Sequence, residues 1–117
     1  MASILVHEQQ RIREIEAESA EIRQLRRDIN TVHRHITRLA LLGEGVIGWE
    51  EADGARYRAF RLRTDSLLQA LKPRCAAYVH PAQIDTLRSL LSVKETHLLD
   101  IMEAMGEQDA ADSLLVN

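Results

Sequence analysis

Hydrophobic residues recur along much of the chain at the three- and four-residue spacing of an amphipathic helix. The most regular repeat lies between residues 15 and 39, where isoleucine occupies every seventh position. Leucine or valine stands three residues after each of the last three isoleucines. Glu18 stands at the corresponding position after the first isoleucine. This arrangement matches positions a and d of a coiled-coil heptad. The predicted seam consists of Ile15, Ile22, Leu25, Ile29, Val32, Ile36 and Leu39.

Glycine and proline divide the chain into three predicted helices. Ser3 is placed to cap the first helix, and Gly43 is placed to end it. Pro81 suits the first turn of the third helix, and Gly106 suits its end. The predicted segments are a long helix in residues 1–42, a second helix in 49–72, a third in 81–105, and a tail in 106–117.

The composition supports an all-α fold. Hydrophobic residues make up 45% of the chain, but aromatic residues make up only 3%, which favours helix packing over a sheet sandwich. The short connection in residues 73–80 predicts that the second and third helices form an antiparallel hairpin. We therefore expect one all-helical domain over residues 1–117, with a coiled-coil-like first helix beside a helical hairpin.

The first helix is too long to be covered by the hairpin. About 38 helical residues extend roughly 57 Å, whereas the second helix extends roughly 36 Å. The uncovered part, around residues 1–17, therefore calls for a partner, and we expect a homodimer through the seam. In a parallel pair, Glu21 would face Arg26 and Asp28 would face His33 of the other copy, which favours that orientation. Antiparallel pairing, an extended monomer and a different partner chain stay open as alternatives.

Arginine accounts for 13 of the 15 basic residues, which raises the possibility of phosphate recognition. A dimeric nucleic-acid-associated regulator is therefore the alternative function. Acidic residues are interspersed among the arginines, the net charge is −3, and no known DNA-binding motif is visible, so nucleic acid is not favoured. The candidate contact residues are Arg23, Arg27, Arg56, Arg61 and Arg63.

The acidic residues concentrate in the last third of the chain. Residues 75–117 contain seven Asp and Glu against two Lys and Arg, whereas residues 1–74 contain 11 against 13. An acidic face of this kind would meet a basic surface on a larger protein. The preferred function is therefore a non-enzymatic interaction module of the adaptor, inhibitor or antiactivator type.

No motif in the chain predicts catalysis or cofactor binding. The segment 43–48 matches GxGxxG, but a dinucleotide site needs a preceding strand, and a long helix is predicted there instead. His33 and His35 lie two residues apart, so they point to different sides of a helix and cannot share one metal ion. Cys75 and His80 share a predicted loop but have no evident orienting carboxylate. We expect no enzymatic activity, no cofactor and no metal site.

The N-terminal sequence and the cysteine content favour a cytoplasmic protein. The first residues lack the basic leader and apolar stretch of a secretory signal. No apolar run approaches the length that crosses a bilayer, so no membrane association is expected. A single cysteine excludes an internal disulfide framework.

Overall fold

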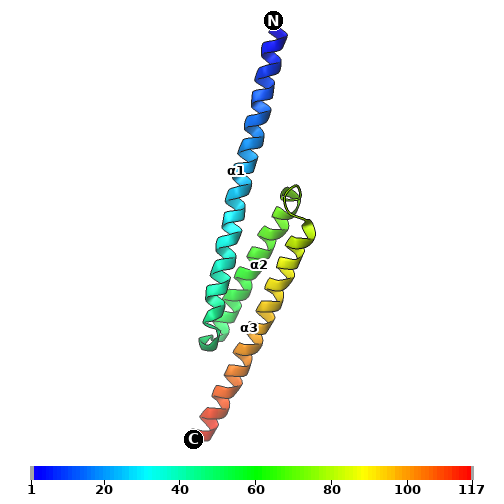
Figure 1. The fold of residues 1–117 in the computed structure, drawn as a ribbon. Helices are drawn as coiled ribbons and strands as arrows, with labels where there is room; N and C mark the ends of the chain where they lie inside the picture. Colours follow the sequence, from blue (N-terminus) through cyan, green and yellow to red (C-terminus); the bar gives the residue numbers. More distant parts are fainter. Residues whose placement is uncertain (1, 117) are drawn as a thin grey trace.

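A computed structural model describes residues 2–116 of the chain, and these residues contain three α-helices and one short 3₁₀ helix (Figure 1). No strand occurs within the described residues, so the all-α prediction is confirmed. The molecule is elongated, with principal extents of 94 × 22 × 16 Å. The elements are α1 (Ala2–Glu44), η1 (Val46–Gly48), α2 (Glu51–Arg74) and α3 (Pro81–Val116).

Helix α1 contains 43 residues and is therefore about 65 Å long. The helix begins before Ser3, which was predicted to cap it. It also continues through Gly43, which was predicted to end it. Gly43 is buried, and a Cβ atom there would lie 3.2 Å from Leu98 Cδ1 of α3. The glycine thus lets two helices approach closely instead of ending the first one.

Helix α2 begins and ends two residues later than predicted. The side chains of Glu50 and Asp53 form a capping box, in which the Glu50 N–H donates to Asp53 Oδ2 at 2.8 Å. Pro73 lies inside the last turn and does not stop the helix there. The following Cys75 N–H still donates to the Leu71 carbonyl at 2.9 Å, so the loss of the proline donor is tolerated.

Helix α3 extends to Val116 instead of ending at Met105. Gly106 keeps a helical conformation, since no glycine in residues 2–116 has a positive φ angle. The predicted tail is thus a direct continuation of α3, apart from Asn117, which lies outside the described residues. This extension carries Leu114 and Leu115 on its surface, and both are exposed.

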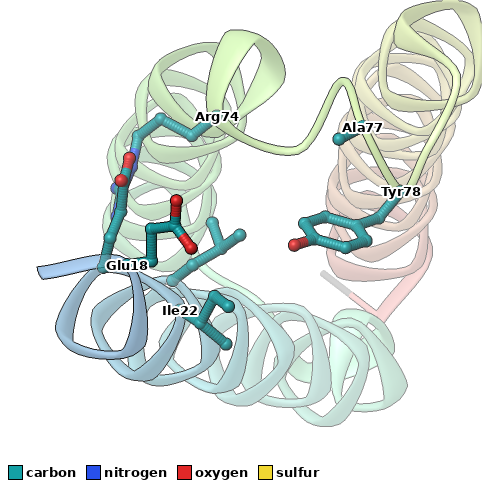
Figure 2. Close-up of a pocket in the computed structure, with 7 residues that line it drawn as sticks. Glu18, Ile22, Arg74, Ala77 and Tyr78 are labelled. Atoms are coloured by element: carbon teal, nitrogen blue, oxygen red, sulfur yellow. The ribbon is translucent and has the colours of Figure 1, made fainter. Parts of the chain in front are cut away.

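Helix α2 packs between α1 and α3 (Figure 1). Contacts with α1 run in opposite order along the two helices. Near the end of α2, Arg74 Nη1 donates to Asp28 Oδ2 at 2.7 Å, and Figure 2 shows Arg74 beside α1. Nearer its start, Trp49 Nε1 donates to the Leu42 carbonyl at 3.1 Å. The two helices are therefore antiparallel.

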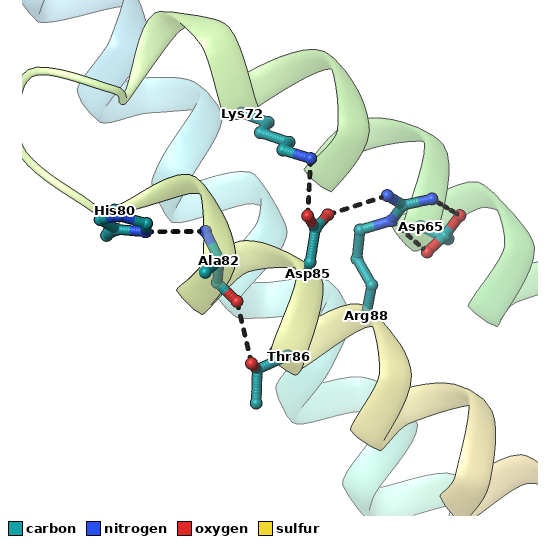
Figure 3. Close-up of polar contacts among 7 residues, drawn as sticks. All are labelled: Asp65, Lys72, His80, Ala82, Asp85, Thr86 and Arg88. Atoms are coloured by element: carbon teal, nitrogen blue, oxygen red, sulfur yellow. Dashed lines mark hydrogen bonds and ion pairs between the residues drawn. The ribbon is translucent and has the colours of Figure 1, made fainter.

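Contacts between α2 and α3 also run in opposite order, along a ladder of ion pairs. Lys72 Nζ lies 2.6 Å from Asp85 Oδ2, and Arg88 bridges Asp85 and Asp65, as Figure 3 shows. The guanidinium of Arg88 lowers the pKa of the Asp65 carboxyl below its ordinary value by hydrogen bonding. These directional pairs fix the register of the two helices.

The ladder ends in a buried ion pair, in which Arg61 Nη2 donates to Glu95 Oε2 at 2.9 Å. The exposed fractions of their side chains are only 11% and 7%. Arg61 Nε, Glu95 Oε1 and the Tyr57 hydroxyl are buried without a hydrogen-bond partner. Burial and the nearby Glu95 raise the pKa of Tyr57, which stays neutral.

The hydrophobic core follows the two seams that α2 makes with its neighbours. Tyr57 is 1% exposed and packs near Trp49, with 5.2 Å between the ring centroids. Close packing also explains Gly54, where a Cβ atom would lie 3.0 Å from side-chain atoms of Leu99 and Met102. The buried hydrophobic residues are Leu25, Val32, Leu39, Val46, Tyr57, Leu68, Leu71, Cys75, Ile84, Leu91 and Leu98.

Candidate protein-interaction surface

The N-terminal segment, which we define as residues 3–24 of α1, has no buried side chain. It projects beyond the turn that joins α2 to α3 (Figure 1). The expectation that the first part of this helix is uncovered is confirmed, and the uncovered part extends past residue 17. Several large apolar side chains are exposed on it, namely Ile4, Leu5, Val6, Ile12, Ile15 and Ile22.

The structure divides the predicted seam between two environments. The d positions Leu25, Val32 and Leu39 are 7%, 5% and 1% exposed, because α2 packs against them. The a positions Ile15, Ile22 and Ile29 are 55%, 40% and 44% exposed, and Ile36 is half-buried. The seven residues therefore do not form one free surface. Any pairing that keeps this core has to use the a side of the helix.

An open apolar groove lies beside these a positions. Helices α1 and α3 are close where Gly43 meets Leu98, and they separate toward the turn at residues 75–80 (Figure 1). The space between them is a groove of about 240 Å³ with α2 as its floor. Its lining includes Ile29 and Ile36 from α1, Leu68 and Leu71 from α2, and Ile84 and Leu87 from α3. We call this feature the apolar groove.

A second hollow of about 260 Å³ lies closer to the N-terminal segment, between α1 and the turn that follows α2. Figure 2 shows Glu18, Ile22, Arg74 and Tyr78 around it. Tyr78 is 70% exposed, so an aromatic ring is presented to solvent there. The hydrogen bond from Arg74 lowers the pKa of Asp28 nearby, and that carboxyl is therefore charged at neutral pH.

The sequence did not identify the α3 side of this surface. Ile84 and Leu87 belong to an amphipathic stripe that fits an ordinary core face, and only the open arrangement of the helices leaves a groove beside them. Tyr78 gave no sequence signal beyond its place in a loop. Helical periodicity identifies apolar faces but does not identify which of them the chain covers itself.

The structure separates the arginines that were proposed to contact nucleic acid. Arg61 is buried with Glu95 and is not available on the surface. Arg23, Arg27, Arg56 and Arg63 are exposed. The side chain of Arg27 donates a hydrogen bond to Gln24 Oε1 in its own helix. Arg56 Nη2 forms an ion pair with Asp53 Oδ1 at 3.5 Å. The five residues therefore do not form one contact surface.

A different arginine cluster forms around His35, on the α1–α2 seam. Burial lowers the pKa of His35, and the positive charges of Arg63, Arg34 and Arg38 lower it further. The imidazole stacks near Phe60, with 4.7 Å between centroids, and the Arg38 guanidinium lies 5.3 Å from the Phe60 centroid. In the described part of the chain, no carboxylate forms an ion pair with any of these three arginines.

The GxGxxG segment and the loop with Cys75 and His80 have ordinary structural places in the fold. The GxGxxG segment lies at the end of α1 and in η1, so the strand that a dinucleotide site requires is replaced by helix. Cys75 is buried, and His80 Nδ1 accepts a hydrogen bond from the Ala82 N–H at 3.1 Å at the start of α3 (Figure 3). Between residues 2 and 116, no group of three or more metal-binding side chains is gathered.

The geometry defines an elongated helical protein with an uncovered apolar helix and an apolar groove. Comparison with known protein families, curated proteins and solved structures found no match to this chain. Among the described residues, no helix combines the length and the apolar character needed to span a membrane.

Proposed function

We propose that this protein is a non-enzymatic protein-interaction module of the adaptor, inhibitor or antiactivator type. It self-associates through α1 and binds a larger protein through its remaining surface, and we expect it to act in the cytoplasm. The observation that carries the proposal is the uncovered N-terminal segment, with its large apolar side chains beside an open apolar groove.

The energetics of the N-terminal segment support a binding role. An isolated helix of about 20 residues is only marginally stable in water, because helix formation depends on packing of its apolar face. Burying one exposed Ile or Leu side chain contributes about 1.5–3 kcal/mol. Ile12, Ile15 and Ile22 therefore provide a driving force for association that the monomer leaves unused.

The C-terminal part of α3 supplies a second surface for a larger partner. Glu107, Asp109 and Asp112 make it acidic, and Leu114 and Leu115 are exposed beyond them. Acidic side chains next to exposed leucines suit a partner with a basic rim around an apolar patch. This surface lies at the opposite end of the molecule from the N-terminal segment (Figure 1), so both can be occupied together.

Light scattering tests self-association through α1. The full chain is expected to have twice the monomer mass, and Ile22→Asp combined with Ile29→Asp is expected to have the monomer mass with unchanged helical circular dichroism. Leu41→Asp is the matched control, because Leu41 is exposed on the same helix away from the repeat, and it should stay dimeric. A wild-type mass of one chain at every concentration would contradict self-association.

A second candidate function is nucleic-acid binding, and the arginine cluster around His35 is the observation that favours it. Guanidinium groups without carboxylate partners suit phosphate oxygens. The test is duplex binding at low and high salt, comparing wild type with Arg38→Ala/Arg63→Ala and with the control Arg13→Ala. Loss of binding only in the double variant supports this function, and absence of any binding at low salt contradicts it.

A further inference from the structure

The groove-side face of α1 carries a continuous stripe of its own. Ile29, His33 and Ile36 line the apolar groove. The same alternation of three- and four-residue steps continues from them toward the N-terminus, through the exposed segment. This spacing is a second coiled-coil seam, rotated away from the d positions that α2 covers. In order, the stripe contains Leu5, Glu8, Ile12, Ile15, Ser19, Ile22, Arg26, Ile29, His33 and Ile36.

The N-terminal segment cannot fill the groove of its own chain. It is continuous with the helix that forms one wall of that groove, and α1 is unbroken from Ala2 to Glu44. The segment therefore points away from the groove beside it (Figure 1). An apolar helix and an apolar groove on one chain can satisfy each other only between two molecules.

We propose that two copies pair in antiparallel orientation, so that the N-terminal segment of each occupies the apolar groove of the other. This inference rests on the self-association proposed above and specifies its geometry. Leu5 of one copy lies opposite Ile36 of the second copy, Ile12 lies opposite Ile29, and Ser19 lies opposite Ile22. Each of these pairs occurs twice because the arrangement has two-fold symmetry.

This register pairs all ten positions of the stripe, and it brings opposite charges together at the flank. Glu8 of one copy lies opposite His33 of the second copy within the seam. At the flank of the seam, Glu16 lies beside Arg23 of the second copy. Opposite charges thus meet at the flank, and a ring N–H of His33 can donate to the Glu8 carboxylate within the seam. The remaining layer places Ile15 against the aliphatic stem of Arg26, whose guanidinium can extend to solvent. The groove that receives the segment supplies Ile29 and Ile36 to its apolar layers.

The alternatives bring like charges together at the flank or in the seam, and the shifted registers also pair fewer positions of the stripe. Shifting the antiparallel register by one heptad in either direction places Glu16 beside Glu16, or Arg23 beside Arg23, at the two-fold axis. The first shift also places Glu8 opposite Arg26, but it leaves His33 and Ile36 without a position opposite them, and the second shift does the same to Leu5 and Glu8. Parallel pairing on the same stripe stacks Arg26 on Arg26 and Glu8 on Glu8. Parallel pairing on the original seam would need Leu25 and the other d residues, which are buried against α2.

The contact is large enough for a specific dimer. The paired region from residue 5 to residue 36 is roughly 48 Å long, and a helix is about 10 Å wide. With the walls of both grooves, the total buried area is on the order of 1,000–1,500 Å², which lies in the range of specific protein interfaces.

Single-cysteine crosslinking tests the orientation in the full-length chain. The variants Ile12→Cys, Ile29→Cys and the double variant are made in a Cys75→Ala background and oxidised. Antiparallel pairing puts positions 12 and 29 of different copies within the Cα separation of about 7 Å that a disulfide can span. It keeps two copies of position 12 roughly 25 Å apart. We expect the double variant to form covalent dimers and neither single variant to do so.

Light scattering of the reduced variants separates the possible failures. Covalent dimers from each single variant would show parallel pairing, which overturns this inference and leaves self-association intact. A dimeric mass without any crosslink would show an interface elsewhere and would also overturn it. A monomeric mass in the wild type and in the Cys75→Ala background would overturn self-association and the antiparallel geometry together.

Discussion

The two halves of α1 carry similar hydrophobic repeats but have different surroundings. In residues 25–44, the d positions are buried against α2, and Leu39 is 1% exposed. In residues 3–24, no side chain of the same helix is buried, and Leu5 is 63% exposed. The boundary lies where α2 ends, near the ion pair between Asp28 and Arg74. A hydrophobic repeat therefore continues beyond the length of the helix that covers it.

This difference shows what an amphipathic repeat does and does not specify. The repeat favours helix and defines an apolar face in both halves. It does not specify whether the cover comes from the same chain, since an intramolecular helix and a second copy present the same kind of surface. In α1 the d side is covered within the chain, and the a side remains available for another molecule.

The largest expected difference between the halves concerns stability. Leu39→Ala should lower the free energy of unfolding by about 2–5 kcal/mol, because it leaves a cavity in the core. Leu5→Ala should change it by less than about 0.5 kcal/mol, because exposed substitutions remove little packing. Urea unfolding at a concentration where the chain is monomeric measures both. Equal losses in the two variants would show that the N-terminal segment is packed within the monomer.

A smaller difference is expected in the dependence of stability on pH. The folded pKa of His35 is below its ordinary value of 6.5, so the folded state resists its protonation. Its stabilising contribution is present above about pH 6.5 and is lost as the pH falls below that value. His35→Gln should flatten the decline in unfolding free energy between pH 7 and 5. His7→Gln, in the exposed segment, is the control and should leave that decline in place. A decline that is unchanged in His35→Gln and flattened in His7→Gln would contradict the assignment of this pH dependence to His35.

The smallest expected effect comes from the charged flank of the antiparallel seam. Glu16→Arg and Arg23→Glu should each weaken dimerisation a few-fold, because one exposed ion pair contributes about 0.2–1 kcal/mol and the dimer has two. The double variant should recover the wild-type dissociation constant in analytical ultracentrifugation. Arg13→Glu makes the same change in charge off the stripe and serves as the control. Additive weakening in the double variant would exclude this register.

The sequence predicted the helices better than their ends. The start of α2 was placed two residues too early, at residue 49, because the capping box of Glu50 and Asp53 was not predicted. The two glycines that were predicted to end helices do not, because a glycine also serves for close packing, as at Gly43, or remains an ordinary helical residue, as at Gly106. Local propensity cannot separate these roles, since they depend on what lies opposite.

The candidate surface was predicted in part. The uncovered start of α1 followed from the helix lengths alone, because a helix of about 36 Å cannot cover one of about 57 Å. The groove and the burial of Arg61 did not follow, since both depend on how α3 lies against α2. An arginine on a helix looks the same in sequence whether it faces solvent or a buried carboxylate such as Glu95.

The sequence by itself determined that this protein is helical, that its first helix is much longer than its second, and that an apolar repeat runs along that helix. These features depend on periodicity and chain length, which are local properties. Only the tertiary structure decided that α2 packs against Leu25, Val32 and Leu39 and buries them, whereas Ile22 and Ile29 stay exposed. The choice between the two sides of one helix depends on where the neighbouring helix packs, and that is set by contacts between residues far apart in the chain.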